Sequence, residues 1–271
     1  INKLSSVIGG GNLATAWISG LVNPPRAHIK IRVSDPNAGA RQHLETTFRV
    51  KTYSDSIDAV KDADVILLAV KPQIMPQVLT QLTGHIKPGQ LVLSIAAGTT
   101  MGSIRQQLGH DIQVIRSMPN TPALVGHGIT GAVAASNCSP EQRQQAEEIL
   151  MAAGDVVWLD EESLMDAVTA ISGTGPAYFF LLTEVLAEAA RDMGLPEDTA
   201  DRLASITCFG AGAMLASSPG EAAELRRRVT SPNGTTHAAM ELLKGEGYRE
   251  LVKRAAEAAR KRSKELSGDS E

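Results

Sequence analysis

The first part of the chain alternates short apolar runs with stretches of helical spacing. Residues 65–70, Val-Ile-Leu-Leu-Ala-Val, are apolar throughout, which is typical of a strand covered on both faces. Stretches such as residues 13–21 and 74–82 repeat apolar residues at helical intervals. This alternation predicts an α/β domain with a Rossmann-type, doubly wound and mostly parallel sheet. The other predicted strands span residues 4–8, 29–34, 50–52, 91–95, 113–117, 129–135 and 156–159.

From Glu162 onward the strand pattern stops and Ala-rich helical stretches follow. Gly194 and Pro196 separate two of these stretches, as a helix-ending and a helix-starting residue. We therefore expect a dinucleotide-binding domain over residues 1–162 and an all-α domain over residues 163–271. Ala-rich helices with few local partners must bury their apolar faces elsewhere, so we expect the second domain to dimerise. The helices are predicted at residues 164–171, 177–193, 196–216, 220–229, 232–243 and 248–266.

The amino-acid composition and charge bear on whether the protein binds nucleic acids or membranes. The 271 residues are 43% hydrophobic, which is enough for a core in each domain. The formal net charge of −4 gives no reason to expect a nucleic acid, and the basic residues near the C-terminus alternate with glutamates. No apolar run reaches the roughly 18 residues that a membrane helix requires, so we expect no membrane partner.

The spacing of the cysteines and histidines indicates whether the protein binds a metal ion and in which cellular compartment it works. Cys138 and Cys208 fit neither a disulfide framework nor a zinc site, and the six histidines form no HExxH pair. We therefore expect no metal and a reducing, cytoplasmic location.

A glycine-rich turn follows the first predicted strand and opens the first predicted helix. Residues 9–14, Gly-Gly-Gly-Asn-Leu-Ala, match the pattern G-x-G-x-x-A. The first glycine permits a tight turn, the second lets the backbone approach a pyrophosphate, and the small last residue lets helix pack on strand. Free N–H groups at the helix start favour the anion. The expected cofactor contacts here are Gly9, Gly11, Asn12, Leu13 and Ala14.

Further candidate contacts follow the ends of other strands. Asp35 has the spacing of the acidic residue that binds a ribose hydroxyl in NAD enzymes. Ser34 is suited instead to a 2′-phosphate, and Arg41 lies about one helical turn onward, so spacing leaves NAD and NADP both open. Ligands of open α/β sheets lie beyond the carboxyl ends of the strands, so we expect the same edge to carry Pro36, Ala69, Val70, Lys71, Ala97 and Asn120.

Three further motifs complete a family resemblance. They are residues 116–123 (RSMPNTPA), 172–178 (SGTGPAY) and 229–236 (VTSPNGTT). Together with residues 9–14 and 69–72, they resemble the pyrroline-5-carboxylate reductases in order along almost the whole chain. That family reduces the cyclic imine of pyrroline-5-carboxylate to L-proline with NADPH or NADH, in the last step of proline biosynthesis. Its members dimerise through the helical domain and often assemble further into decamers.

The resemblance also implies roles for single residues. Ser231 and the backbone of residues 234–236 would hold the substrate carboxylate, and the Thr236 hydroxyl would face the ring nitrogen. Ser34 and Ser56 would lie near the adenosine, with NADP(H) favoured over NAD(H). Three positions depart from the usual pattern: Asn233 stands where many members have Gly, Thr174 where Ser is frequent, and Ser56 where several members have Asn. The implied substrate contacts are Ser231, Gly234, Thr235 and Thr236.

Local chemistry agrees with these roles. Ser231-Pro232 is typical of an N-cap followed by the first residue of a helix, which would aim N–H groups at an anion. A cyclic imine can enter already protonated, so the cofactor's hydride and one nearby hydroxyl would suffice. His237 would face about 100° away from Thr236 on a helix, so we expect it to be a packing or surface residue.

Two other functions are compatible with a dinucleotide-binding domain followed by a helical domain. A 3-hydroxyacid or 6-phosphogluconate-type dehydrogenase shares the two-domain plan but uses a lysine on a helix of its second domain. The helical domain here has no lysine before Lys244, which argues against that class. A non-catalytic NAD(P)-binding sensor would bind cofactor tightly without turnover.

Overall fold

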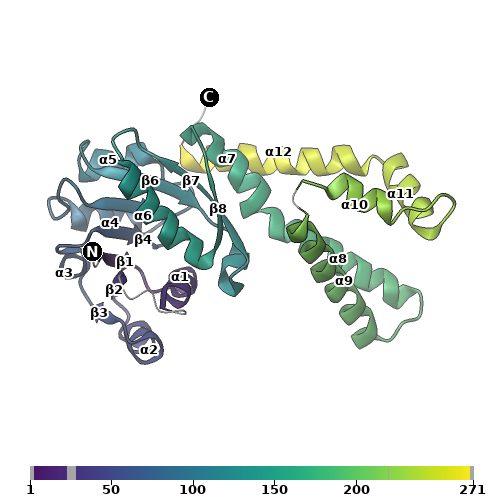
Figure 1. Ribbon diagram of the computed structural model, residues 1–271, viewed down its shortest axis with the longest axis horizontal. Coiled ribbons are helices and arrows are strands. Elements are labelled where there is room, and N and C mark those ends of the chain that lie inside the picture. Colours follow the sequence, from purple (N-terminus) through teal and green to yellow (C-terminus); the bar gives the residue numbers. More distant parts are fainter. Residues whose placement is uncertain (1–2, 23–28, 219, 269–271) are drawn as a thin grey trace. The chain divides into compact units, whose positions relative to one another are not determined.

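The computed structural model describes residues 3–22, 29–218 and 220–268 (Figure 1). They form two compact units, one of Ile1–Gly173 with Arg260–Glu271 and one of Thr174–Ala259. This division differs from the expected boundary after residue 162. Contacts beyond residue 162 agree with this division, because Ser263 bonds to Asp166 and Gly173 lies close to Met118 within the first unit.

One eight-stranded sheet forms the centre of the first unit. Its order is β3-β2-β1-β4-β5-β6-β7-β8, and every neighbouring pair is parallel except β6 and β7. The predicted doubly wound, mostly parallel sheet is confirmed, with small shifts at the strand ends. The strands are β1 (Lys3–Ile8), β2 (Ile29–Ser34), β3 (Lys51–Tyr53), β4 (Val65–Leu68), β5 (Leu91–Ser94), β6 (Gln113–Met118), β7 (Gly128–Ala134) and β8 (Gly154–Trp158).

Helices cover both faces of this sheet. Side chains of α1, α2 and α6 pack in one buried cluster and those of α3, α4 and α5 in the other. Strand β4 contributes Leu67 to the first cluster and Ile66 and Leu68 to the second, which explains its unbroken apolar run. The helices are α1 (Asn12–Val22), α2 (Ala38–Phe48), α3 (Ser56–Val60), α4 (Met75–Leu82), α5 (Met101–Leu108) and α6 (Pro140–Leu150).

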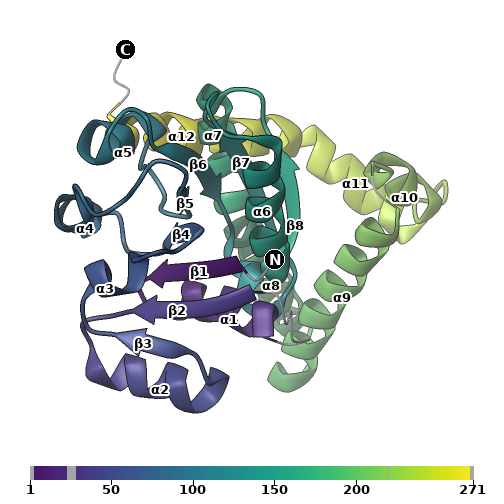
Figure 2. The same ribbon diagram turned by 60° about the vertical axis from the view of Figure 1, so that its left-hand side comes forward.

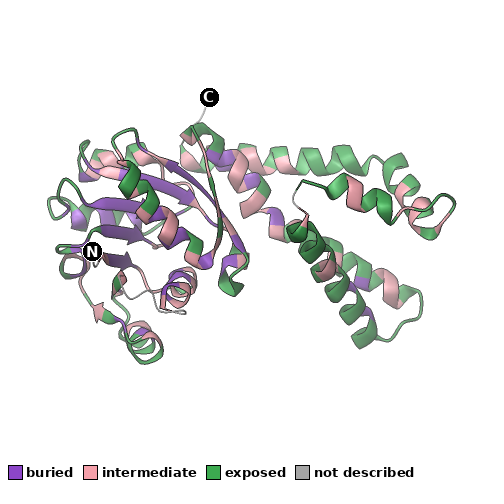
Figure 3. Ribbon diagram, in the orientation of Figure 1, coloured by how far each residue is buried: buried purple, intermediate pink, exposed green. Residues whose placement is uncertain are grey.

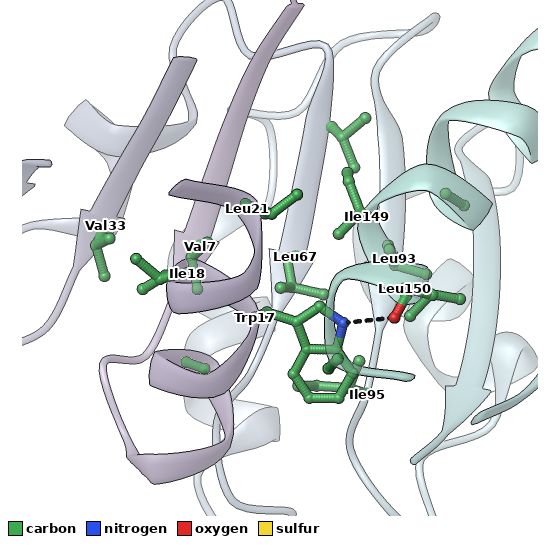
Figure 4. Packing of buried hydrophobic residues seen from close by; sticks show 14 of the residues in the cluster. Val7, Trp17, Ile18, Leu21, Val33, Leu67, Leu93, Ile95, Ile149 and Leu150 are labelled. Atoms are coloured by element: carbon green, nitrogen blue, oxygen red, sulfur yellow. Dashed lines mark hydrogen bonds between the residues drawn. The ribbon is translucent and has the colours of Figure 1, made fainter. Parts of the chain in front are cut away.

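Trp17 is the largest fully buried side chain of the first cluster. Its indole N–H donates to the Leu150 carbonyl at 3.3 Å, so the buried ring keeps a hydrogen-bond partner (Figure 4). In Figure 3 the strands are mostly coloured as buried, so the core of this unit lies on the sheet. The buried sheet therefore supports the residues that follow the carboxyl ends of its strands.

A continuous helical segment begins at Glu162. A 3-10 turn (Glu162–Leu164), α7 (Met165–Val168) and a π-helical turn (Thr169–Gly173) lead directly into α8. Glu162–Asp192 is long and apolar enough to cross a membrane by length and composition alone, and 17% of its most apolar window is buried. This corrects the expectation that no stretch reaches that length, because the short elements join without a break. A helix that buries an apolar face against another protein meets the same criterion.

The second unit is entirely helical among its described residues. Helices α8 and α9 lie side by side as a hairpin (Figures 1 and 2), and Gly194, with φ of 93°, lies in their connection. Many large apolar side chains on these two helices are exposed, among them Phe180 and Phe209. Figure 3 colours most of both helices as exposed. The helices are α8 (Gly175–Asp192), α9 (Glu197–Ser217), α10 (Ala222–Arg228), α11 (Thr235–Gly245) and α12 (Tyr248–Ser267), whose residues from Arg260 onward belong to the first unit.

Candidate functional site

The first glycine of the turn after β1 is required by its surroundings. Gly9 has φ of 101°, and its N–H donates to the Ser34 carbonyl at 2.9 Å. A Cβ at this position would lie 2.8 Å from the Ala69 carbonyl oxygen and 3.0 Å from Cγ1 of Val70. Gly9 therefore lets the ends of β1, β2 and β4 approach one another closely.

The other residues of the turn have different surroundings. No described protein atom lies within 4 Å of a Cβ built on Gly11, and Gly11 and Asn12 are exposed where α1 begins. Ala14 is fully buried in the first core cluster, and Leu13 packs against that cluster. The turn thus presents backbone and a helix N-terminus on its outer side and packs a small side chain on its inner side, as a pyrophosphate site requires.

Asp35 holds this turn in place. Its Oδ2 accepts the Gly10 N–H at 2.8 Å, and its Oδ1 accepts the Asn37 N–H at 2.8 Å. Nη1 of Arg41 donates to the carbonyl oxygens of Asp35 at 2.8 Å and of Pro36 at 3.0 Å. Both carboxylate oxygens are therefore engaged by the backbone, and a cation lies beside this end of β2.

The structure also brings Ser34 and Ser56 together. Their hydroxyl oxygens lie 3.0 Å apart, and Ser34 is 2% exposed. Ser56 begins α3, and Asp55, the N-cap of that helix, accepts the Ile57 N–H at 2.9 Å. The hydroxyl pair therefore joins the carboxyl end of β2 to the start of α3.

The remaining candidates follow the ends of neighbouring strands. Lys71 and Ala97 are exposed just after β4 and β5, and Ala69 and Val70 are partly buried beside Gly9. Asn120 has a structural partner, because its Oδ1 accepts the Ile129 N–H at 2.9 Å and so ties the turn after β6 to β7. Since β1 to β6 run parallel, all these residues lie at one edge of the sheet.

Two of the sequence motifs meet in the first unit. A Cβ on Gly173 would lie 2.8 Å from Cε of Met118, so the motifs of residues 116–123 and 172–178 are in contact. The π-helical turn that ends at Gly173 was not predicted. Such turns occur frequently at functional sites.

Sequence reasoning also missed Glu162. Its Oε1 lies 2.8 Å from Nη1 of Arg116 and accepts the Met101 N–H at 2.8 Å. The three residues are far apart in the chain, and Glu162 follows another glutamate in a polar stretch. No local pattern could have indicated this partnership.

In the second unit, residues 231–234 form a turn rather than the start of a helix. The Gly234 N–H donates to the Ser231 carbonyl at 3.0 Å, and Asn233 between them has φ of 61°. Pro232 at the second position and a positive φ at the third are the features of a type II turn. The predicted N-cap at Ser231 was therefore wrong, because the Asn233 backbone cannot continue a helix from Pro232.

Helix α11 instead begins at Thr235, with Gly234 as its N-cap. Gly234 makes no side-chain cap, and the first N–H groups of a helix have no partner inside it. The N–H groups of Thr235, Thr236 and His237 therefore begin the helix at its positive end. Asn233 is among the residue types that tolerate a positive φ, which explains why glycine or asparagine suits this position.

Cys138 is the cysteine of the first unit. Burial raises the pKa of the Cys138 thiol, which contacts the Val114 carbonyl at 3.4 Å, so this cysteine has the character of a packing residue. The described ranges contain no group of three or more His, Cys, Asp or Glu that could hold a metal ion.

Comparisons with known proteins agree with the motifs. The family Pyrroline-5-carboxylate reductase dimerisation matches residues 162–266, and the family NADP oxidoreductase coenzyme F420-dependent matches residues 6–98. A pyrroline-5-carboxylate reductase of Pseudomonas aeruginosa is 46% identical over 260 residues, covering 96% of this chain and 95% of the relative. One of Pasteurella multocida is 39% identical over 263 residues, covering 96% of each chain.

Solved structures give the same result. The structure of a pyrroline-5-carboxylate reductase from Coxiella burnetii has a TM-score of 0.94 at 36% identity, covering 98% of this chain and 99% of the other. That of Plasmodium falciparum pyrroline carboxylate reductase with NADP bound has a TM-score of 0.83 at 27% identity, covering 98% of each chain. The chain therefore belongs to the pyrroline-5-carboxylate reductase family.

Proposed function

We propose that this protein reduces the C=N bond of 1-pyrroline-5-carboxylate to L-proline with NAD(P)H, the last step of proline biosynthesis. The observation that carries the proposal is the match to reductases of this name over 96% of the chain, at 46% identity to one of them. The glycine turn at the carboxyl edge of the sheet and the helix start at Thr235 supply the two anion sites that the reaction needs.

The first unit is proposed to bind the cofactor. When bound, the reduced nicotinamide supplies the hydride. The backbone of residues 9–14 and the N-terminus of α1 bind the pyrophosphate, and Ser34, Asp35, Pro36 and Ser56 form the adenosine end. The side chains and backbone that line the rest of the nucleotide are those of Ala69, Val70, Lys71, Ala97 and Asn120.

The region of residues 163–271 is proposed to bind the substrate. The N–H groups at the start of α11, together with Ser231 and Gly234, hold the carboxylate, because a helix N-terminus favours an anion. The Thr236 hydroxyl is proposed to hydrogen-bond to the ring nitrogen. The imine enters protonated, so hydride addition to the ring carbon gives the neutral secondary amine and no side chain must donate a proton.

We infer a preference for NADP(H), with NAD(H) as a second substrate. Asp35 accepts one backbone N–H on each carboxylate oxygen, so its carboxylate helps to hold the turn. The Arg41 guanidinium beside it supports a 2′-phosphate electrostatically. The description of the family matched by residues 6–98 also names NADP.

We infer a homodimer formed through the helical region, and a cytoplasmic location. The dimerisation family matches residues 162–266, and α8 and α9 expose the large apolar side chains that such an interface buries. Assembly of these dimers into a decamer rests on the family resemblance alone.

Steady-state kinetics with NADPH and NADH side by side test the proposal directly. Oxidation of either cofactor on adding pyrroline-5-carboxylate, with proline as the product, is expected. Absence of turnover with both cofactors at saturating imine would refute the reductase. Tight cofactor binding without turnover would point to the sensor instead.

A further inference from the structure

A single carboxylate joins three segments of the first unit. Oε1 of Glu162 lies 2.8 Å from Nη1 of Arg116 on β6 and 2.8 Å from the backbone nitrogen of Met101 at the start of α5. The Arg116 side chain is 6% exposed, so water and salt screen this pair less than they screen a surface pair. A buried cation thus fixes the carboxylate where it meets α5.

Glu162 serves as an external cap for α5. The Met101 N–H is one of the first in the helix, and such groups have no partner inside it. The N-cap residue Thr100 uses its own hydroxyl oxygen to accept the Ser103 N–H at 3.1 Å. Glu162 therefore satisfies a different N–H group and adds a negative charge at the positive end of the helix.

The loop between β5 and α5 also lies near the end of α12. A Cβ built on Gly98 would lie 3.7 Å from the Leu266 carbonyl oxygen, so the two backbones approach each other here. The end of α12 is held in the same unit, because Oγ of Ser263 donates to Oδ1 of Asp166 at 2.6 Å and both residues are buried. Glu162 therefore holds the end of this loop where α5 begins, and the end of α12 lies near Gly98.

We propose that Glu162 is a positioning residue for cofactor binding. With Arg116 it fixes the loop that carries Ala97 to the nucleotide edge of the sheet. The inference rests on the proposed function, since Ala97 contacts a cofactor only if this edge binds NAD(P)H. Backbone contacts depend on exact placement, and in enzymes a shift of about 1 Å in a positioning element can lower the catalytic rate up to about 100-fold.

Three substitutions separate placement from charge. Glu162→Gln keeps the length and an oxygen acceptor for Met101, whereas Glu162→Asp keeps the charge but shortens the reach. Glu162→Ala removes both. We expect the dissociation constant for NADPH, measured by fluorescence titration, to rise roughly tenfold in the Asp and Ala variants and less than about threefold in Gln. The imine KM should change less than the cofactor constant.

Asp201→Ala is the matched control. It removes an ion pair of 2.7 Å to Arg191 in the second unit and should leave NADPH affinity unchanged. An unchanged NADPH constant in both Asp and Ala variants would overturn the proposal, and so would a Gln variant weaker than the Asp variant. If the Glu162→Ala variant does not fold, the comparison of the Asp and Gln variants still tests the proposal. The titration needs no turnover, so failure of the reductase assay with wild-type protein remains a separate result.

Discussion

At the residue scale, two glycines of the same turn have different physical requirements. Gly9 has a positive φ and no room for a side chain, whereas a Cβ on Gly11 meets no described protein atom within 4 Å. Gly9 is thus required by the fold, whereas Gly11 leaves space for a ligand on the outer side of the turn. Substitution can separate these two roles.

Gly9→Ala should therefore destabilise the protein by about 1–3 kcal/mol, because it combines a strained φ with a clash against the Ala69 carbonyl. Gly11→Ala should leave thermal unfolding unchanged but weaken NADPH binding by roughly tenfold or more, since its methyl group would lie where we propose that the pyrophosphate binds. Differential scanning fluorimetry and cofactor titration measure the two effects. Equal loss of stability in both variants would contradict the assignment.

Arg41 gives a second prediction at this scale. Arg41→Ala should raise the KM for NADPH about tenfold and that for NADH less than twofold, because only the 2′-phosphate carries the extra charge. Lys87→Ala is the control, since Lys87 is an exposed lysine that precedes β5 and so lies at the opposite edge of the sheet. An equal rise for both cofactors would indicate general damage to the turn after β2.

Thr236 is expected to act on turnover rather than on cofactor affinity. Thr236→Ala should lower kcat on the order of 10- to 100-fold by removing the hydroxyl beside the ring nitrogen. Thr236→Ser should restore most of that loss, and the NADPH dissociation constant should stay the same in both. Loss of NADPH binding in the Ala variant would refute the role.

At the element scale, the turn before α11 tests what Asn233 contributes. Asn233→Gly should keep stability and imine KM within about twofold, because glycine also adopts a positive φ. Asn233→Ala should cost about 1 kcal/mol or more and raise the imine KM, since it strains the backbone that leads into Thr235. Steady-state kinetics with both variants provide the measurement. A raised KM in the Gly variant would show that the Asn side chain itself contacts substrate.

The elements also show how far the sequence could predict the fold. All eight strands were predicted, because a strand covered on both faces leaves an unbroken apolar run such as residues 65–68. The start of α11 was not predicted correctly, since a Ser-Pro pair is equally compatible with a helix N-cap and with a turn. The backbone angle of Asn233, which decides between them, is not written in any local pattern.

In the candidate site, too, some residues could be predicted from the sequence and others could not. The glycine turn and the strand ends follow from spacing, so most cofactor candidates could be placed at one edge of the sheet. Glu162 could not be found, because its partner Arg116 is 46 positions earlier and its other partner is a backbone N–H. The partners of Asp35 and Asn120 also required coordinates, since both side chains bond to backbone N–H groups of other segments.

At the scale of the whole molecule, the helical region is expected to hold two copies together. Phe180 on α8 is 67% exposed, so Phe180→Glu should weaken the dimer by tenfold or more. Light scattering over a dilution series measures the mass. Met151→Glu, an exposed apolar residue of the first unit, is the control and should leave the mass unchanged. A wild-type monomer at all concentrations would overturn the dimer.

The return of α12 to the first unit has a consequence for how the protein is made. That unit contains both the earliest strands and Arg260–Glu271, so it is not a contiguous piece of sequence. During synthesis Ser263, the partner of Asp166, arrives only after the second unit, Thr174–Ala259, has been translated. The first unit therefore gains its last hydrogen bond between distant segments late in synthesis, and a chain cut after Gly173 would lack it.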